Sequence, residues 1–288
     1  IEFAEPNYKV SLTATSDDPG VLDGSTWGLY GSATTPSSSH GANAVTAWTN
    51  GYTGNKQVYV AVIDSGIDVS HPDLAGNMWV NSGEIAGDGI DNDGNGYVDD
   101  VHGYDFLNND GSVFDAGEHP HGTHVAGTIG AVGGNGAGVA GVMWNVNLIS
   151  AKTINSSGAA DLASTIAAID YITDLRTKKG LDIIASNNSW GGTRYSKALE
   201  DAIKRGGDAG IIFVAAAGNE ATNLDSTAHY PAAYDCSTSH RIFDCVVSVA
   251  AIDQAGDLAG YSNFSATKVD IAAPGSNVYS TMPGNSYG

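Results

Sequence analysis

The sequence predicts an α/β domain with a doubly wound, mostly parallel β-sheet flanked by helices in three layers. Three observations support this fold class. Short apolar runs are bounded by Gly, Asn, Asp or Pro, as expected of parallel strands covered on both faces. Helical periodicities lie between these runs, so strands and helices alternate along the chain. The 288 residues, 42% of them hydrophobic, suffice for one large domain with a buried core.

The individual elements follow from this alternation. Six buried strands are predicted at 58–64, 147–153, 182–188, 211–216, 246–251 and 269–272. A short helix is expected at 42–48. Asp161 can cap a second helix, on which apolar residues recur at helical spacing. These apolar residues are Leu162, Ile166, Ile169 and Ile172. A third helix is predicted at 195–205, where Ala198, Leu199, Ala202 and Ile203 share one face.

Two segments lie outside this alternation. Residues 1–40 are rich in Ser, Thr, Gly and Pro and are predicted to form an irregular arm on a domain that spans 41–288. Residues 84–118 are polar and glycine-rich, without an apolar period, and are predicted to be an insertion. Ligands of parallel sheets gather at the carboxyl ends of the strands, where Asp64, Ser189 and Asn219 are expected.

Charge and cysteine content limit the possible functions. Acidic residues outnumber basic ones 32 to 12, for a net charge of −20, which argues against nucleic-acid binding. This balance suits a soluble protein in an extracellular or saline setting and the binding of cations, the alternative being that it serves solubility alone. No apolar run reaches the roughly 18 residues of a membrane span. Cys236 and Cys245 flank a polar stretch and predict a local disulfide in an oxidising compartment, the alternative being two free thiols.

Two motifs point to nucleophilic catalysis. One predicted strand ends on Asp64 and a tight turn, and His121 opens a predicted helix in His121-Gly-Thr-His124. An aspartate that orients an imidazole and a histidine that acts as base are two of the three parts of a nucleophilic hydrolase. Zinc binding by His119, His121 and His124 is the alternative for the histidine cluster.

The two motifs and their neighbours resemble a known family, the subtilisin-type serine proteases or subtilases. The similar segments are Val62-Ile-Asp-Ser-Gly-Ile-Asp68, His71-Pro-Asp-Leu74, His121-Gly-Thr-His-Val-Ala-Gly-Thr128, Asn187-Asn-Ser-Trp-Gly-Gly192, Ala215-Ala-Ala-Gly-Asn-Glu220 and Ala272-Ala-Pro-Gly275. They occur in the family's order over about residues 20–288. The resemblance implies a subtilisin-like fold. It also implies that Asp64 orients His121, that His121 acts as base, and that Asn219 donates to an oxyanion hole.

The resemblance further implies a substrate site. In this family an extended peptide pairs between two edge segments, by strand addition. The implied substrate-binding residues are Ser157, Gly158, Ser189, Trp190, Gly191, Gly218 and Glu220. Trp190 has an alternative interpretation as an ordinary core residue. Glu220 gives the hypothesis that the primary pocket favours a basic side chain.

Calcium is the expected cofactor. Asp91, Asp93, Asn95 and Asp99 have the alternate spacing of an oxygen-ligand loop, with Gly96 at its sharp turn. Position 102 is His instead of the Glu that closes an EF-hand loop, so Asp88 or Asp100 is expected to complete the shell, and Tyr97 belongs to the predicted set. The alternative is a solvated acidic loop. Asp73 matches a calcium ligand of the family, although the segment 129–138 is shorter than the usual ligand loop.

The nucleophile is the largest departure from the family pattern. In subtilases it lies in Gly-Thr-Ser-Met-Ala, soon after the Ala-Pro-Gly turn, and Ser262, Ser265 and Ser286 lack that context. We therefore expect a secreted serine endopeptidase that acts on proteins or peptides, with its serine on a C-terminal segment beyond residue 288. Residues 3–8 resemble the last strand of the family's inhibitory propeptide. The alternative function is a non-catalytic relative that binds peptide or calcium.

Overall fold

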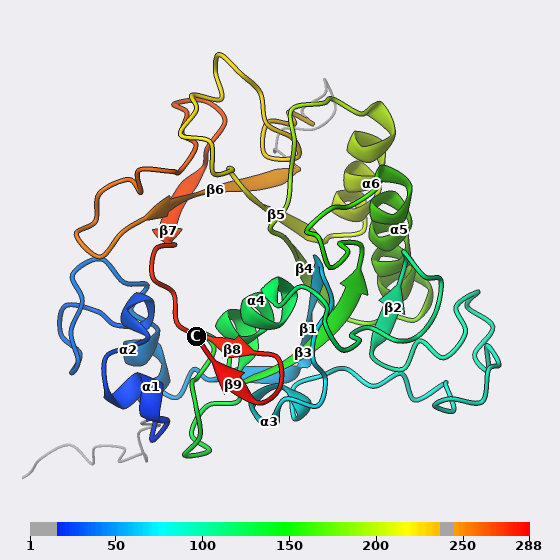
Figure 1. The fold of residues 1–288 in the computed structure, drawn as a ribbon, viewed down its shortest axis with the longest axis horizontal. Coiled ribbons are helices and arrows are strands. Elements are labelled where there is room, and N and C mark those ends of the chain that lie inside the picture. Colours follow the sequence, from blue (N-terminus) through cyan, green and yellow to red (C-terminus); the bar gives the residue numbers. More distant parts are fainter. Residues whose placement is uncertain (1–15, 237–244) are drawn as a thin grey trace, which may run out of the picture.

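A parallel sheet organises the chain (Figure 1). The computed structural model describes residues 16–236 and 245–288. Within them, seven parallel strands form the order β2-β3-β1-β4-β5-β6-β7. Their bounds are β1 Gly54–Asp64, β2 Gly103–Asp105, β3 Asn145–Lys152, β4 Ile183–Asn188, β5 Ile212–Ala216, β6 Val246–Ile252 and β7 Ile271–Pro274. This architecture confirms the predicted three-layer α/β class.

All six predicted strands are present, and one further strand of the seven-stranded sheet was missed. β2 lies within 84–118, so that segment is not wholly irregular: its residues Gly103–Asp105 pair with the end of β3 and form the sheet edge. Three residues are too few for an apolar period to show in the sequence. A two-stranded hairpin, β8 (Thr281–Met282) and β9 (Ser286–Tyr287), packs against α4.

The helices are α1 (Pro19–Leu22), α2 (Ala44–Thr49), α3 (Pro72–Ala75), α4 (His121–Gly130), α5 (Leu162–Lys178) and α6 (Lys197–Asp208), with a 3₁₀ turn η1 (Trp27–Leu29). Asp161 caps α5 as predicted, because its carboxylate accepts a hydrogen bond from the Ser164 amide at 2.9 Å. α6 begins two residues later than predicted, since the hydroxyl of Ser196 accepts from the Leu199 amide. No helix in the described part of the chain combines the length and apolarity needed to cross a bilayer.

Alternation along β1 decides which helix covers which face. Val60 and Val62 pack in a cluster with Ala126 of α4, whereas Ala61 and Ile63 pack in the cluster that contains the buried faces of α5 and α6. Because strand side chains alternate, the next residue, Asp64, points to the α4 face at the carboxyl end of β1. The fold thereby aims a fully buried carboxylate at the beginning of α4.

The described part of the N-terminal segment is more ordered than predicted. It contains the short helical elements α1 and η1, between stretches without regular secondary structure. Trp27 donates its indole N–H to the Ser276 carbonyl at 2.8 Å, and Tyr30 is 2% exposed. The Trp27 contact depends on a partner about 250 residues away and left no local signal. Residues 3–8, with their propeptide-like sequence, lie outside the described residues.

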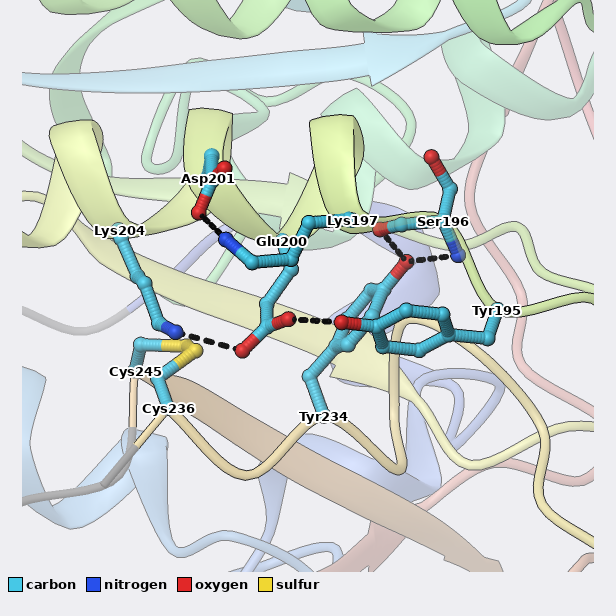
Figure 2. Close-up of a disulfide and its surroundings, with 9 residues drawn as sticks. All are labelled: Tyr195, Ser196, Lys197, Glu200, Asp201, Lys204, Tyr234, Cys236 and Cys245. Atoms are coloured by element: carbon cyan, nitrogen blue, oxygen red, sulfur yellow. Dashed lines mark hydrogen bonds and ion pairs between the residues drawn. A yellow bond between two sulfur atoms is a disulfide. The ribbon is translucent and has the colours of Figure 1, made fainter. Parts of the chain in front are cut away.

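Cys236 and Cys245 form the predicted disulfide (Figure 2). Both half-cystines are buried in the same apolar cluster as Leu199 and Ile203 of α6. Figure 2 also shows the polar side of α6, where Lys204 donates to the Glu200 carboxylate at 2.6 Å. The intervening residues 237–244 lie outside the described residues.

Candidate active site

The structure brings the predicted orienting aspartate and the predicted base together. Nδ1 of His121 lies 2.8 Å from Oδ1 and 3.0 Å from Oδ2 of Asp64. Asp64 is fully buried at the end of β1, while the His121 side chain is 42% exposed at the start of α4. A buried carboxylate on Nδ1 holds the proton at that nitrogen and leaves Nε2 free to accept one. This arrangement suits a general base.

Short backbone contacts hold the two residues in register. The hydroxyl of Ser65 donates to the His119 carbonyl and accepts from the Gly122 amide, both at 2.9 Å. Gly122 has no room for a side chain, because an added Cβ would lie 2.3 Å from the Gly66 carbonyl oxygen. The turn after β1 and the first turn of α4 are therefore in direct backbone contact.

The electrostatics of the pair favour the protonated imidazole. The hydrogen bond that His121 donates to Asp64 is the largest cause that raises the pKa of His121 above its ordinary value of 6.5, and desolvation opposes it. Since the pKa in the folded state exceeds that of the unfolded chain, the pair contributes its full stability below about pH 6.5. That contribution is lost as the pH rises through the folded pKa.

A cleft of about 870 Å³ opens beside the dyad. Asp64 and His121 line it. Of the predicted substrate residues, Gly158, Ser189, Trp190 and Gly191 line it as well. Much of the remaining wall is apolar or aromatic and comes from Ile154, Leu162, Leu199, Tyr195 and Tyr230. Trp190 fits both interpretations, as a substrate-binding residue and as a core residue, since it lines the cleft and also packs against Phe213 in the core.

The predicted oxyanion segment forms a separate turn after β5. Asn219 and Glu220 are exposed there, and Gly218 has a positive φ of 112°. Asn263 holds this turn, because its amide donates to the Gly218 carbonyl at 2.9 Å and its side chain donates to Glu220 at 2.7 Å. Gly218, Asn219, Glu220 and the exposed Ser157 do not line the 870 Å³ cleft.

His229 is a residue of this region that sequence reasoning missed. It is 8% exposed, and its Nε2 lies 3.7 Å from the Glu220 carboxylate. Its Cε1 would lie 2.3 Å from a Cβ on Gly191 and 3.1 Å from one on Gly218. The imidazole therefore occupies space between two predicted substrate segments. A lone histidine next to Tyr-Pro gave no sequence signal for this position.

Three carboxylates gather in the predicted calcium segment. Atoms of Glu84, Asp93 and Asp100 lie within 4.8 Å of one another. Asp93 and Asp100 were predicted, whereas Glu84 was missed because it precedes the aspartate-rich run by several residues. Burial raises the pKa of Asp100 to about 6, although hydrogen bonds from Tyr171, Asn95 and Asn81 oppose this effect. A buried carboxyl whose ionisation is disfavoured is suited to a neutralising cation.

The other predicted ligands have different contacts. Asp88, Asp91 and Asp99 accept hydrogen bonds from backbone amides of the same loop. Tyr97 packs its ring against three other aromatic rings. Asn95 donates to Asp100 at 2.8 Å.

Asp73 lies apart from this loop. It is fully buried, and its carboxylate accepts from the Asn135 side chain and the Val139 amide. Asp73, the calcium ligand predicted from the family resemblance, therefore faces the segment that follows α4.

The zinc alternative gains no support from the geometry. Within the described residues, Glu84, Asp93 and Asp100 are the one group of three or more acidic, His or Cys side chains close enough to share an ion. The His119 and His121 rings are 6.1 Å apart, and His124 Nε2 contacts backbone carbonyls, including that of Val278 at 3.1 Å. The three histidines therefore do not converge.

Comparison with known proteins places this site in a family. A family model described as the subtilase family matches residues 55–288. The thermophilic serine proteinase of Bacillus sp. (strain AK1) is 32% identical over all of this chain, which spans 58% of that protein. Subtilisin-like protease 1 of Plasmodium berghei (strain Anka) is 35% identical over 79% of this chain, which spans 39% of that protein.

A shorter relative and a solved structure agree with these matches. Subtilisin DY of Bacillus licheniformis is 36% identical over 82% of this chain and 71% of its own length. The crystal structure of a cold adapted subtilisin-like serine proteinase superposes with a TM-score of 0.60 at 26% identity, over 82% of this chain and 71% of that one. Because the family model covers most of its length and these relatives exceed 30% identity, the chain belongs to the subtilase family.

Proposed function

We propose that the chain carries the orienting aspartate and the general base of a serine endopeptidase. The observation that carries this proposal is the Asp64–His121 hydrogen bond at the mouth of a cleft of about 870 Å³. Asp64 keeps the proton of the imidazole on Nδ1. His121 Nε2 then takes the proton of a serine hydroxyl as that oxygen attacks the peptide carbonyl, and returns it to the leaving amine.

Asn219 is proposed as the oxyanion donor. Its exposed side chain stands on a turn that Asn263 fixes, so an amide N–H is available without displacing an internal hydrogen bond to that turn. Such a donor acts where negative charge develops on the carbonyl oxygen. The nucleophile is proposed to be a serine on a C-terminal segment, as the family resemblance implies, because Ser262, Ser265 and Ser286 lack the sequence context of the family's nucleophile.

The substrate is proposed to be an extended peptide. Gly158 and Ser189–Gly191 line the same cleft from two separate segments and offer backbone groups for strand addition. Trp190 anchors one wall, because its indole donates to the Ile63 carbonyl at 3.0 Å, one residue before Asp64. The segment proposed to pair with the peptide is thereby attached to β1, the strand that carries Asp64.

A fluorophosphonate probe with intact mass spectrometry tests the proposed activity. Labelling of a serine in complex with this chain, abolished by His121→Ala and retained by the exposed His40→Ala, is the expected result. Absence of labelling in the folded protein, with peptide binding intact, would instead favour a non-catalytic relative that binds peptide.

We further propose that Glu84, Asp93 and Asp100 hold calcium. Three carboxylates on a glycine-rich turn supply the oxygen ligands that this ion prefers, and the buried Asp100 requires neutralisation. Bound calcium would supply positive charge that stabilises the insertion. Calorimetric titration should show binding and a raised melting temperature, both lost in Asp93→Asn and kept in Asp174→Asn, an acidic control on α5. A titration without heat or thermal shift would refute the site.

The working compartment is proposed to be extracellular and oxidising. A disulfide persists in such a compartment, and Cys236–Cys245 is buried against α6. An inhibitory propeptide is proposed as a partner, on the resemblance of residues 3–8. Free thiols in the protein isolated from its source would contradict the compartment, and a matching peptide that fails to inhibit hydrolysis would contradict the partner.

A further inference from the structure

A row of alternating charges crosses the carboxyl ends of three strands. Lys152 of β3 is in register with Asp64 of β1 on one side and with Asp105 of β2 on the other. Asp64 and Lys152 point to the α4 face, because Val62 on β1 and Leu148 on β3, which lie an even number of residues away, pack there. Asp105 points the same way, because its neighbour Tyr104 packs on the opposite face, in the cluster with α5 and α6. The catalytic carboxylate therefore has a lysine as its neighbour in the sheet.

The Lys152 ammonium joins the edge strand β2 to the segment that precedes α4. Its Nζ lies 2.7 Å from Asp105 and 2.9 Å from Glu118, and the exposed side-chain fractions of the three residues are 2%, 0% and 13%. Among the described residues, Lys152 is the one buried Lys or Arg. Burial opposes its charge, yet the hydrogen bonds and charges of the two carboxylates outweigh burial and raise the pKa of Lys152.

Glu118 connects this ion pair to the dyad. It lies three residues before His121, and the next residue, His119, accepts a hydrogen bond from Ser65 through its carbonyl. The short segment 118–121 is thus attached to β3 at one end and to the turn after β1 at the other. The two attachment points lie on β3 and just after β1, and these two strands pair directly, so the beginning of α4 is anchored to the sheet at both.

We propose that Lys152 is a positioning residue for the catalytic dyad: by binding Asp105 and Glu118 it fixes the segment that places His121 against Asp64. This inference rests on the proposed function for its catalytic meaning. The placement of His121 against Asp64 by Lys152 does not itself require a nucleophile. Lys152 would touch neither the peptide nor the transferred proton, and its effect would reach the reaction through the His121 ring.

Glu118→Gln is the sharpest perturbation. It preserves shape and leaves the Lys152–Asp105 pair intact, so the edge strand is retained. With ¹³C-labelled histidine, NMR titration should show the pKa of His121 falling toward the free-imidazole value of about 6.5, with loss of its downfield Nδ1 proton signal. Lys152→Met should give the larger change. Lys204→Met removes an ion pair of similar length on α6 and should leave the His121 signals unchanged.

A purely structural role predicts a different pattern. If Glu118→Gln lowers the melting temperature while the pKa and Nδ1 signal of His121 stay at their parent values, the proposal is overturned. It is also overturned if Lys204→Met alters the His121 signals to the same extent. The fluorophosphonate test addresses the proposed function separately, because the NMR readout reports the dyad whether or not a serine reacts.

Discussion

Gly122→Ala offers a direct test of how the dyad is held. The added Cβ would lie 2.3 Å from the Gly66 carbonyl oxygen, whereas carbon and oxygen approach no closer than about 3.3 Å in ordinary contacts. The first turn of α4 must therefore retreat by about 1 Å. The Nδ1–Oδ1 distance of 2.8 Å would then grow to about 3.8 Å, beyond hydrogen-bonding range.

The expected consequence is a loss of about 10²-fold in kcat/KM, or about 3 kcal/mol of transition-state stabilisation. Steady-state cleavage of a peptide substrate measures the rate, and NMR titration should show a lowered pKa for His121. Gly260→Ala is the matched control, because a Cβ there would meet nothing within 4 Å. A folded Gly122→Ala protein with the parent rate and the parent pKa would refute the reasoning.

The remaining predictions concern pH, charge, space and crosslinking. Because the pKa of His121 is raised, activity should rise with pH through a midpoint above 6.5, and a pH–rate profile checks this. For Asp100 the folded pKa of about 6 exceeds the ordinary 3.8, so its stabilising effect is present below pH 3.8 and lost by about pH 6, a difference of about 3 kcal/mol. Asp100→Asn should accordingly raise the melting temperature in chelator at pH 7, as calorimetry would show. His229→Gly should empty the space between the two substrate segments and raise cleavage after Phe relative to Ala; an unchanged ratio would place the primary pocket elsewhere. Cys236→Ser, which opens a crosslink of nine-residue separation, should cost about 2–3 kcal/mol in denaturant unfolding.

The elements predicted well are those whose cause is local. Strands such as 58–64 are mostly apolar runs, and the cap at Asp161 is a short-range hydrogen bond, so both can be predicted from the sequence. β2 is different: Gly103–Asp105 becomes a strand because β3 offers it a partner, and that partner lies about 45 residues further along the chain. No local pattern encodes such a pairing.

The candidate site divides in the same way. Asp64 and His121 were found through their motifs, and the structure joins them at 2.8 Å. Glu84 and His229 were missed because only folding brings them to their neighbours. The Glu84 carboxylate lies close to that of Asp93, nine residues further along the chain, and the His229 ring fills the space between Gly191 and Gly218. Asp91 and Asp99 were predicted as calcium ligands from their alternate spacing, and in the structure their carboxylates accept hydrogen bonds from backbone amides of the turn.

The intrinsic fluorescence of Trp190 offers a way to observe the cleft. Of the five tryptophans, Trp27, Trp48, Trp79 and Trp144 are at most 8% exposed, and Trp190 alone is partly open to solvent. Indole emission shifts to shorter wavelength when water leaves its surroundings. A peptide that enters beside Ser189 and Gly191 would displace that water, so occupancy of the cleft should appear as a blue shift in the intrinsic fluorescence. The chain therefore carries its own optical probe of substrate binding, which functions without turnover.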